Sequence, residues 1–110
     1  MSRWSFLSVV VVVLWVTPVS AQSATQVDVY ARGLVNPKGM VFAPDGVLYV
    51  AESGNHRIQK FTAEGAPLGT WGGPGKAPGM LHNPWALAVD SKGRVHVVDT
   101  ENHRVQRIRF

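Results

Sequence analysis

Two short segments of the chain hold the side chains best suited to chemistry. Each places a carboxylate, an asparagine, an imidazole and a guanidinium within six residues: Glu52, Asn55, His56 and Arg57 in one, and Asp99, Asn102, His103 and Arg104 in the other. Carboxylates and imidazoles can transfer protons or bind metal ions. The repetition favours a structural role, because a reaction needs its catalytic group once, whereas a repeated unit needs its stabilising contacts in every copy. We expect each carboxylate to meet its arginine across a hairpin, and each asparagine to bond to the turn backbone.

No other group of residues has the spacing of a reactive site. The four histidines form no HxH or HxxxH pair, the spacings that direct two imidazoles at one metal ion. Gly75-Lys76 resembles the end of a phosphate-binding loop, but Thr70 and Ala77 stand where that loop needs glycine and a hydroxyl residue. We interpret this Gly-rich stretch as a flexible connection. The chain has no cysteine, which excludes a thiolate nucleophile or ligand. The sequence therefore predicts no catalytic residue, no metal site and no cofactor.

Size and charge narrow the class of protein. A chain of 110 residues allows one small domain. The formal net charge is +4, but lysine and arginine are scattered along the sequence rather than grouped. Such a distribution is typical of an ordinary solvated surface rather than of a basic patch for nucleic acid. We therefore expect no nucleic-acid partner.

The first 21 residues have the order of a secretory signal peptide. Arg3 precedes an apolar run from Phe6 to Val16, and Pro18 then leads to the small residues Ser20 and Ala21. A positive start, a short apolar stretch and small residues at the cleavage site are the three parts of such a peptide. We expect cleavage after Ala21 and a secreted or periplasmic protein. If cleavage failed, the same segment would instead anchor the chain in a membrane.

The remaining sequence is a repeat. A shift of 47 residues (83 − 36) places Asn36-Pro37 on Asn83-Pro84 and the first reactive segment on the second without a gap. Residues 40–42, 47–50, 57–61 and 67–71 of the first unit are rich in β-branched and aromatic residues, as are residues 86–90, 95–98 and 104–110 of the second. Turn-forming stretches such as Pro44-Asp45-Gly46 separate these runs. The pattern predicts short antiparallel strands.

The two reactive segments, Asn55-His56-Arg57-Ile58-Gln59 and Asn102-His103-Arg104-Val105-Gln106, resemble the signature of the NHL repeat. The resemblance implies an all-β fold, with two four-stranded antiparallel blades of a six-bladed β-propeller, incomplete as a single chain. We divide the NHL-repeat region, residues 22–110, into repeat one at about 33–79 and repeat two at about 80–110. A further strand is expected at about 26–31, where Val27, Val29 and Ala31 alternate with polar residues.

Enzymes with this kind of propeller supply a comparison for activity. The resemblance implies a relation to the peptidyl-amidoglycolate lyases, whose metal-binding histidines follow the proline that opens an innermost strand. Lys38 and Trp85 hold those positions here, and neither can replace an imidazole on zinc. Gluconolactonase-like propellers need carboxylates from many blades. We therefore expect an extracytoplasmic binding or scaffold module without catalytic residues, and the alternative is a fragment of a larger secreted enzyme of either type.

The ligand is expected to be a protein, a small molecule or a glycan. Lys38 and Trp85 are candidate contacts at the channel mouth, although Trp85 is equally suited to packing between blades. Two blades alone leave apolar faces open to water. One explanation is that the strand at 26–31 completes the second unit of its own or a neighbouring chain, so that three chains close a six-bladed homotrimeric ring. The other is that the chain is a piece of a longer propeller.

Overall fold

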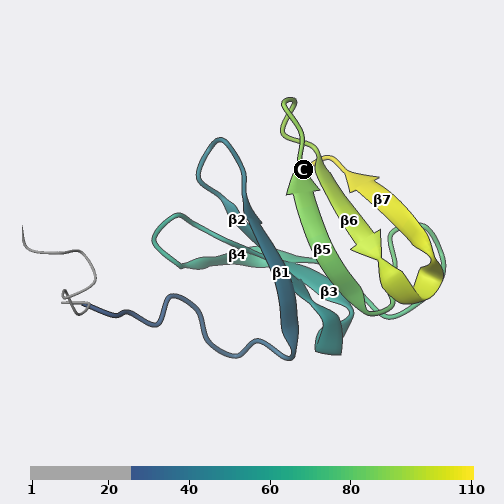
Figure 1. Cartoon of the computed structure of the whole chain (residues 1–110), viewed down its shortest axis with the longest axis horizontal. Helices are drawn as coiled ribbons and strands as arrows, with labels where there is room; N and C mark the ends of the chain where they lie inside the picture. Colours follow the sequence, from purple (N-terminus) through teal and green to yellow (C-terminus); the bar gives the residue numbers. More distant parts are fainter. Residues whose placement is uncertain (1–25) are drawn as a thin grey trace, which may run out of the picture.

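The strands of the computed structural model, which describes residues 26–110, form two antiparallel sheets (Figure 1). The first sheet has the order β1 (Pro37–Phe42), β2 (Leu48–Glu52), β3 (Arg57–Phe61) and β4 (Pro67–Gly72). The second has the order β5 (Pro84–Val89), β6 (Val95–Asp99) and β7 (Arg104–Ile108). Single 3-10 turns, η2 (Ser53–Asn55) and η3 (Thr100–Asn102), connect β2 to β3 and β6 to β7. The all-β prediction is confirmed, but the second sheet has three strands rather than four.

The segment before β1 differs from its prediction. Residues 26–31, predicted as a strand, form none in the structure. Tyr30 lies edge-on to Phe61, and its hydroxyl donates to the backbone oxygen of Thr62. These contacts hold the segment on the first sheet, far from the edge strand β7 of the same chain (Figure 1). The predicted signal peptide, residues 1–21, lies outside the described residues, and no helix among those described could span a membrane.

The strands form where side chains can alternate between two buried faces. In β2 all five residues are buried, with Leu48 and Val50 on one face of the sheet and Tyr49 and Ala51 on the other. The tight turn before β2 is fixed by Gly46, whose φ of 88° suits glycine, and by Asp45, whose carboxylate accepts from the Val47 N–H at 3.1 Å. The sequence therefore defines both the strand and the turn that starts it.

One face of each sheet packs on the other sheet, and we call this contact the seam. Its buried residues from the first sheet include Tyr49, Ala51 and Ile58, and those from the second include Val95 and Val97. In Figure 1, β1 and β5 lie alongside each other at the centre of the molecule. A methyl group on Gly39 of β1 would lie 2.6 Å from the backbone oxygen of Trp85. Only glycine permits the two strands to approach so closely.

Candidate ligand-binding site

The acidic and basic residues of the two predicted segments meet as expected. Glu52 pairs with Arg57 across the β2–β3 hairpin, and Asp99 pairs with Arg104 across the β6–β7 hairpin. The Nε–carboxylate distances are 2.7 Å in the first pair and 2.9 Å in the second. Both carboxylate side chains are fully buried, whereas the arginines are about one-third exposed. A buried carboxylate needs such partners, because burial without them would be very costly.

The asparagines bind differently from the prediction. Asn55 donates to the Glu52 carboxylate, and Asn102 donates to Asp99 at 2.9 Å, whereas backbone bonds within the turns were expected. The turns instead close through His56 and His103, whose N–H groups bond to the first residue of each 3-10 turn and whose φ angles are 51° and 52°. The left-handed conformation of each histidine turns the chain sharply, so that the arginine that follows lies opposite the carboxylate.

The hydrogen bonds at each carboxylate stabilise its charged form. Burial by itself would raise the pKa of Glu52, but bonds from Arg57, from the Val35 N–H and from Asn55 outweigh burial and lower that pKa. Burial opposes the same kind of lowering at Asp99, where the His82 N–H donates at 2.7 Å. Both groups therefore stay ionised near neutral pH, with their oxygens occupied by structural bonds.

In the second repeat, the signature also holds the loop that precedes the sheet. Arg104 donates to the backbone oxygens of Lys76, Ala77 and Met80 at 2.8 to 3.0 Å. Gln106 accepts from the Gly79 N–H and donates to Met80. We expected this Gly-rich stretch to be flexible, but at least five hydrogen bonds from side chains of β7 fix its backbone. The positive φ angles of Gly72, Gly73 and Gly79 allow its tight path.

His56 and His82 contact each other, whereas His96 contacts an acidic side chain. The His56 and His82 rings lie edge to face with centroids 5.1 Å apart, and His56 Nδ1 accepts from the Asn83 N–H at 2.9 Å. His96 Nε2 lies 3.0 Å from Asp90. No group of three or more histidine or acidic side chains among the described residues could hold a metal ion. The imidazole of His56 thus serves as a bridge from one sheet to the backbone of the next.

Lys38 and Trp85, the two ligand candidates of the sequence, are brought together by the seam. They lie at the second positions of β1 and β5, and the Lys38 ammonium is 4.9 Å from the centroid of the Trp85 ring. Trp85 is 49% exposed, so one part of the indole faces solvent while the amine covers another part. A shallow hollow of about 300 Å³ beside them is lined by Pro37, Lys38, Gly39 and Met40. The arrangement can bind an apolar group next to an anionic one.

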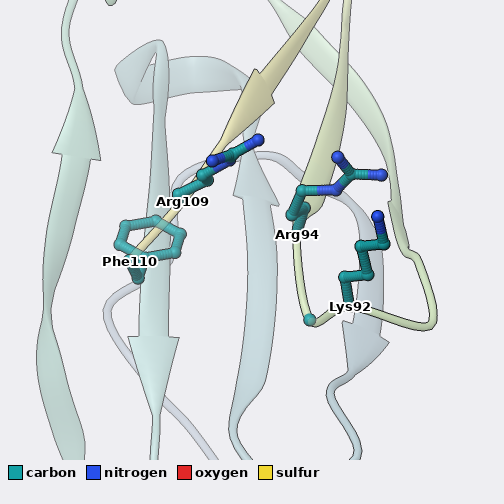
Figure 2. Close-up of a pocket in the computed structure, with 5 residues that line it drawn as sticks. Lys92, Arg94, Arg109 and Phe110 are labelled. Atoms are coloured by element: carbon teal, nitrogen blue, oxygen red, sulfur yellow. The ribbon is translucent and has the colours of Figure 1, made fainter.

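A second hollow, of about 390 Å³, was missed by the sequence analysis. Figure 2 shows Lys92 and Arg94 on the turn that joins β5 to β6, and Arg109 and Phe110 after β7. Arg94 is already paired with Asp90 at 2.6 Å, and the bond from His96, followed by those from Arg94, strongly lowers the Asp90 pKa. Lys92 and Arg94 are distant from Arg109 in the sequence, and the β6–β7 pairing brings them together. Their short Lys-Gly-Arg and Arg-Ile-Arg patterns were the available signal.

Comparison with known proteins identifies the repeats. The NHL repeat model matches residues 34–61 and 81–108, which contain β1–β3 and β5–β7. Over 83 residues, or 68% of the chain and 8% of the relative, the sequence is 34% identical to Protein SUPPRESSOR OF QUENCHING 1, chloroplastic, of Arabidopsis thaliana. Over 40 residues, or 36% of the chain and 4% of the relative, it is 48% identical to Protein lin-41 of Caenorhabditis elegans. The matched part of the chain spans less than a tenth of either relative. Because the family model matches each sheet, and both sheets have the same buried carboxylate bonded to an asparagine and an arginine, the chain belongs to the NHL-repeat family.

Proposed function

We propose that the chain is an extracytoplasmic binding module whose ligand contacts Lys38 and Trp85. The observation that carries this proposal is the meeting of a half-exposed indole and an ammonium group from two different sheets. The carboxylate, asparagine and arginine side chains of the signature, in contrast, are bonded to one another within the fold. Function on a repeat fold resides in such grafted sites rather than in the residues that build the repeat.

The surroundings of Lys38 favour a protein ligand. Met40, 65% exposed, and Pro37 give the hollow beside Lys38 an apolar lining. Exposed tryptophan and methionine are enriched where proteins bind one another, and a lysine at the rim selects a carboxylate. We therefore propose an acidic segment of a partner protein that also carries an apolar side chain. Location outside the cytoplasm is supported by the sequence of residues 1–21.

Arrays of immobilised peptides and glycans, probed with the purified protein, test the proposal. Acidic peptides with an aromatic or aliphatic residue should bind, and both Trp85→Ala and Lys38→Ala should weaken that binding by tenfold or more. Lys76→Ala is the matched control, because Lys76 is also exposed and only its backbone oxygen is used. Selective binding of glycans would contradict the choice of a protein ligand. Turnover of a peptidyl-amidoglycolate or of a sugar lactone would favour the enzyme alternative.

A further inference from the structure

Each sheet uses one face in the seam and leaves the other face outward. Tyr49, Ala51 and Ile58 lie on the seam face of the first sheet. On the second sheet, the seam face contains Val95, Val97 and Ile108. A shift by one repeat does not place one set of seam residues on the other, because the two sheets use opposite faces of their strands in the seam. The seam is therefore heterologous: it joins two different surfaces.

The outward faces carry the repeat equivalents of the seam faces. A shift of 47 residues (95 − 48) places the seam residues Val95, Val97 and Ile108 on Leu48, Val50 and Phe61, which lie on the outward face of the first sheet. The same shift places Tyr49, Ala51 and Ile58 on the residues of the outward face of the second sheet: His96, Val98 and Val105. Each sheet thus presents outward the kind of surface that the other sheet uses in the seam.

Both outward faces carry exposed apolar side chains. On the first sheet, Met40 and Phe42 are 65% and 52% exposed, and they pair across the strands with Val50 and Leu48. On the second sheet, Val98 and Val105 are 40% and 63% exposed and lie directly opposite each other. Side chains of this kind occur singly on many surfaces, but adjoining ones mark an interface.

The segment before β1 covers the centre of the outward face of the first sheet, where Leu48, Val50 and Phe61 are 2–5% exposed, and leaves the side chains of β1 exposed. One residue of this segment, Leu34, has an equivalent at the seam. It is the repeat equivalent of Leu81, which is completely buried beside the seam. Leu34 packs against the cluster of Leu48, Val50 and Phe61 in the same way that Leu81 packs at the seam. The first sheet therefore already has the border that the seam requires.

A polar contact of the seam is also preformed at both outer ends. Within the chain, His56 Nδ1 accepts the N–H of Asn83. The repeat equivalents of these two residues are His103 and Asn36. Their φ angles of 52° and 49° match the 51° and 56° of the bonded pair. Among the described residues, neither His103 Nδ1 nor the Asn36 N–H has a hydrogen-bond partner. The acceptor at one end of the chain and the donor at the other are therefore both available for the same contact.

We infer that a second copy of this chain binds head to tail, with the outward face of the second sheet of one copy against the exposed β1 side of the outward face of the first sheet of the next. His103 Nδ1 of one copy accepts the Asn36 N–H of the next. The contact also places Trp85 near Lys38 of the next copy, so the candidate site is repeated at the junction. This inference does not depend on the ligand proposed above. A heterologous contact propagates until a ring closes or a filament forms.

In the contact between copies, β5 of one copy and β1 of the next must lie farther apart than β1 and β5 do in the seam. Ala86 stands on β5 where Gly39 stands on β1. With the spacing of the seam, its methyl group would lie against the backbone oxygen of Lys38 in the next copy, as a methyl on Gly39 would lie 2.6 Å from the Trp85 oxygen. The strands must move apart to relieve this overlap, so we expect the contact between copies to be weaker than the seam. Association is therefore expected to depend on protein concentration.

Light scattering of the purified protein and of two face-blocking variants tests the inference. Met40→Glu places a charge on the outward face of the first sheet, and Val105→Glu does so on the second. The wild type should assemble as its concentration rises, whereas each variant alone should remain monomeric. A mixture of the two variants should give a dimer and nothing larger, because each supplies the face that the other lacks. Ser91→Glu, the same charge change on an exposed turn, should assemble like the wild type.

Several results would overturn the inference: a monomeric wild type at every concentration, assembly of either blocked variant alone, or a mixture that stays monomeric. Assembly of one variant alone would indicate a symmetric contact between like faces instead. Circular dichroism checks that each variant keeps its strands. His103→Asn serves as a milder test, because asparagine accepts a positive φ but lacks the imidazole. Loss of one net hydrogen bond should weaken association about fivefold, and an unchanged association constant would contradict the proposed contact.

Discussion

Replacing Arg104 by alanine should destabilise the protein more than replacing Arg57 by alanine, although the two arginines hold equivalent repeat positions. Among the described residues, Arg57 donates only to Glu52, with bonds of 2.7 and 3.3 Å. Arg104 donates to Asp99 and also to three backbone oxygens of the preceding loop. The comparison therefore separates the contribution of the ion pair from that of the loop contacts.

The size of each effect follows from these bonds. A hydrogen bond to a charged group contributes about 1.5–3 kcal/mol, and the arginine exposures of 33% and 28% favour the lower end because water replaces part of the interaction. We expect Arg57→Ala to cost about 2 kcal/mol. Arg104→Ala loses the same pair and three loop bonds, which water only partly replaces, so its cost should be about 3–4 kcal/mol. Either loss is a large fraction of the stability of a small domain.

Urea unfolding followed by tryptophan fluorescence measures both losses. All samples should have one protein concentration, because self-association would add concentration-dependent stability. Equal losses for the two variants would refute the contribution of the loop bonds. A melting profile unchanged by Arg104→Ala, together with lost ligand binding, would refute the structural interpretation of the signature.

Three further predictions concern export, pH and the seam. Mass spectrometry of the exported protein should find Gln22 at its N-terminus, and an intact Met1 product in the membrane fraction would contradict the signal peptide. The folded-state pKa values of Glu52 and Asp99 are lowered, so their contribution to stability is present above the ordinary pKa values of 4.5 and 3.8 and is lost as pH falls through the folded values. The melting temperature should therefore fall in acid. Glu52→Gln should make this decline shallower. Gly39→Ala should lower the melting temperature by several degrees because its methyl group meets the Trp85 oxygen at 2.6 Å, and an unchanged melting temperature would show that β1 and β5 can separate freely.

Strand positions could be predicted from the sequence because they depend on local patterns. Residues 57–61 coincide with β3, and the other predicted runs differ from the observed strands by at most a few residues. The strand predicted at 26–31 does not form within the single chain, because alternation of Val27 and Val29 shows only that a strand could form, not that an edge lies within reach. Tyr30 instead holds this segment against the first sheet, through its contacts with Phe61 and Thr62.

The site was predictable only in part, for a similar reason. The carboxylate–arginine pairs span a single hairpin, so spacing along the chain is enough to bring them together. The contact between Lys38 and Trp85 depends on how two sheets pack, and the repeat only showed that both residues open corresponding strands. The bridge from His56 to Asn83 was missed altogether, because it joins a side chain to the backbone across the seam. Hydrogen-bond acceptors of this kind leave no regular spacing in the sequence.

The second sheet ends at β7, and this edge has a consequence for how the protein behaves in a crowded solution. The unpaired backbone groups of an edge strand can nucleate fibrils by recruiting other chains. Arg107 lies on this strand and Arg109 follows it, whereas Arg104 is already paired with Asp99. The positive charges of Arg107 and Arg109 act as gatekeepers, because two such edges repel each other at close range. Salt or a polyanion would screen that repulsion, so fibril formation should accelerate as ionic strength rises.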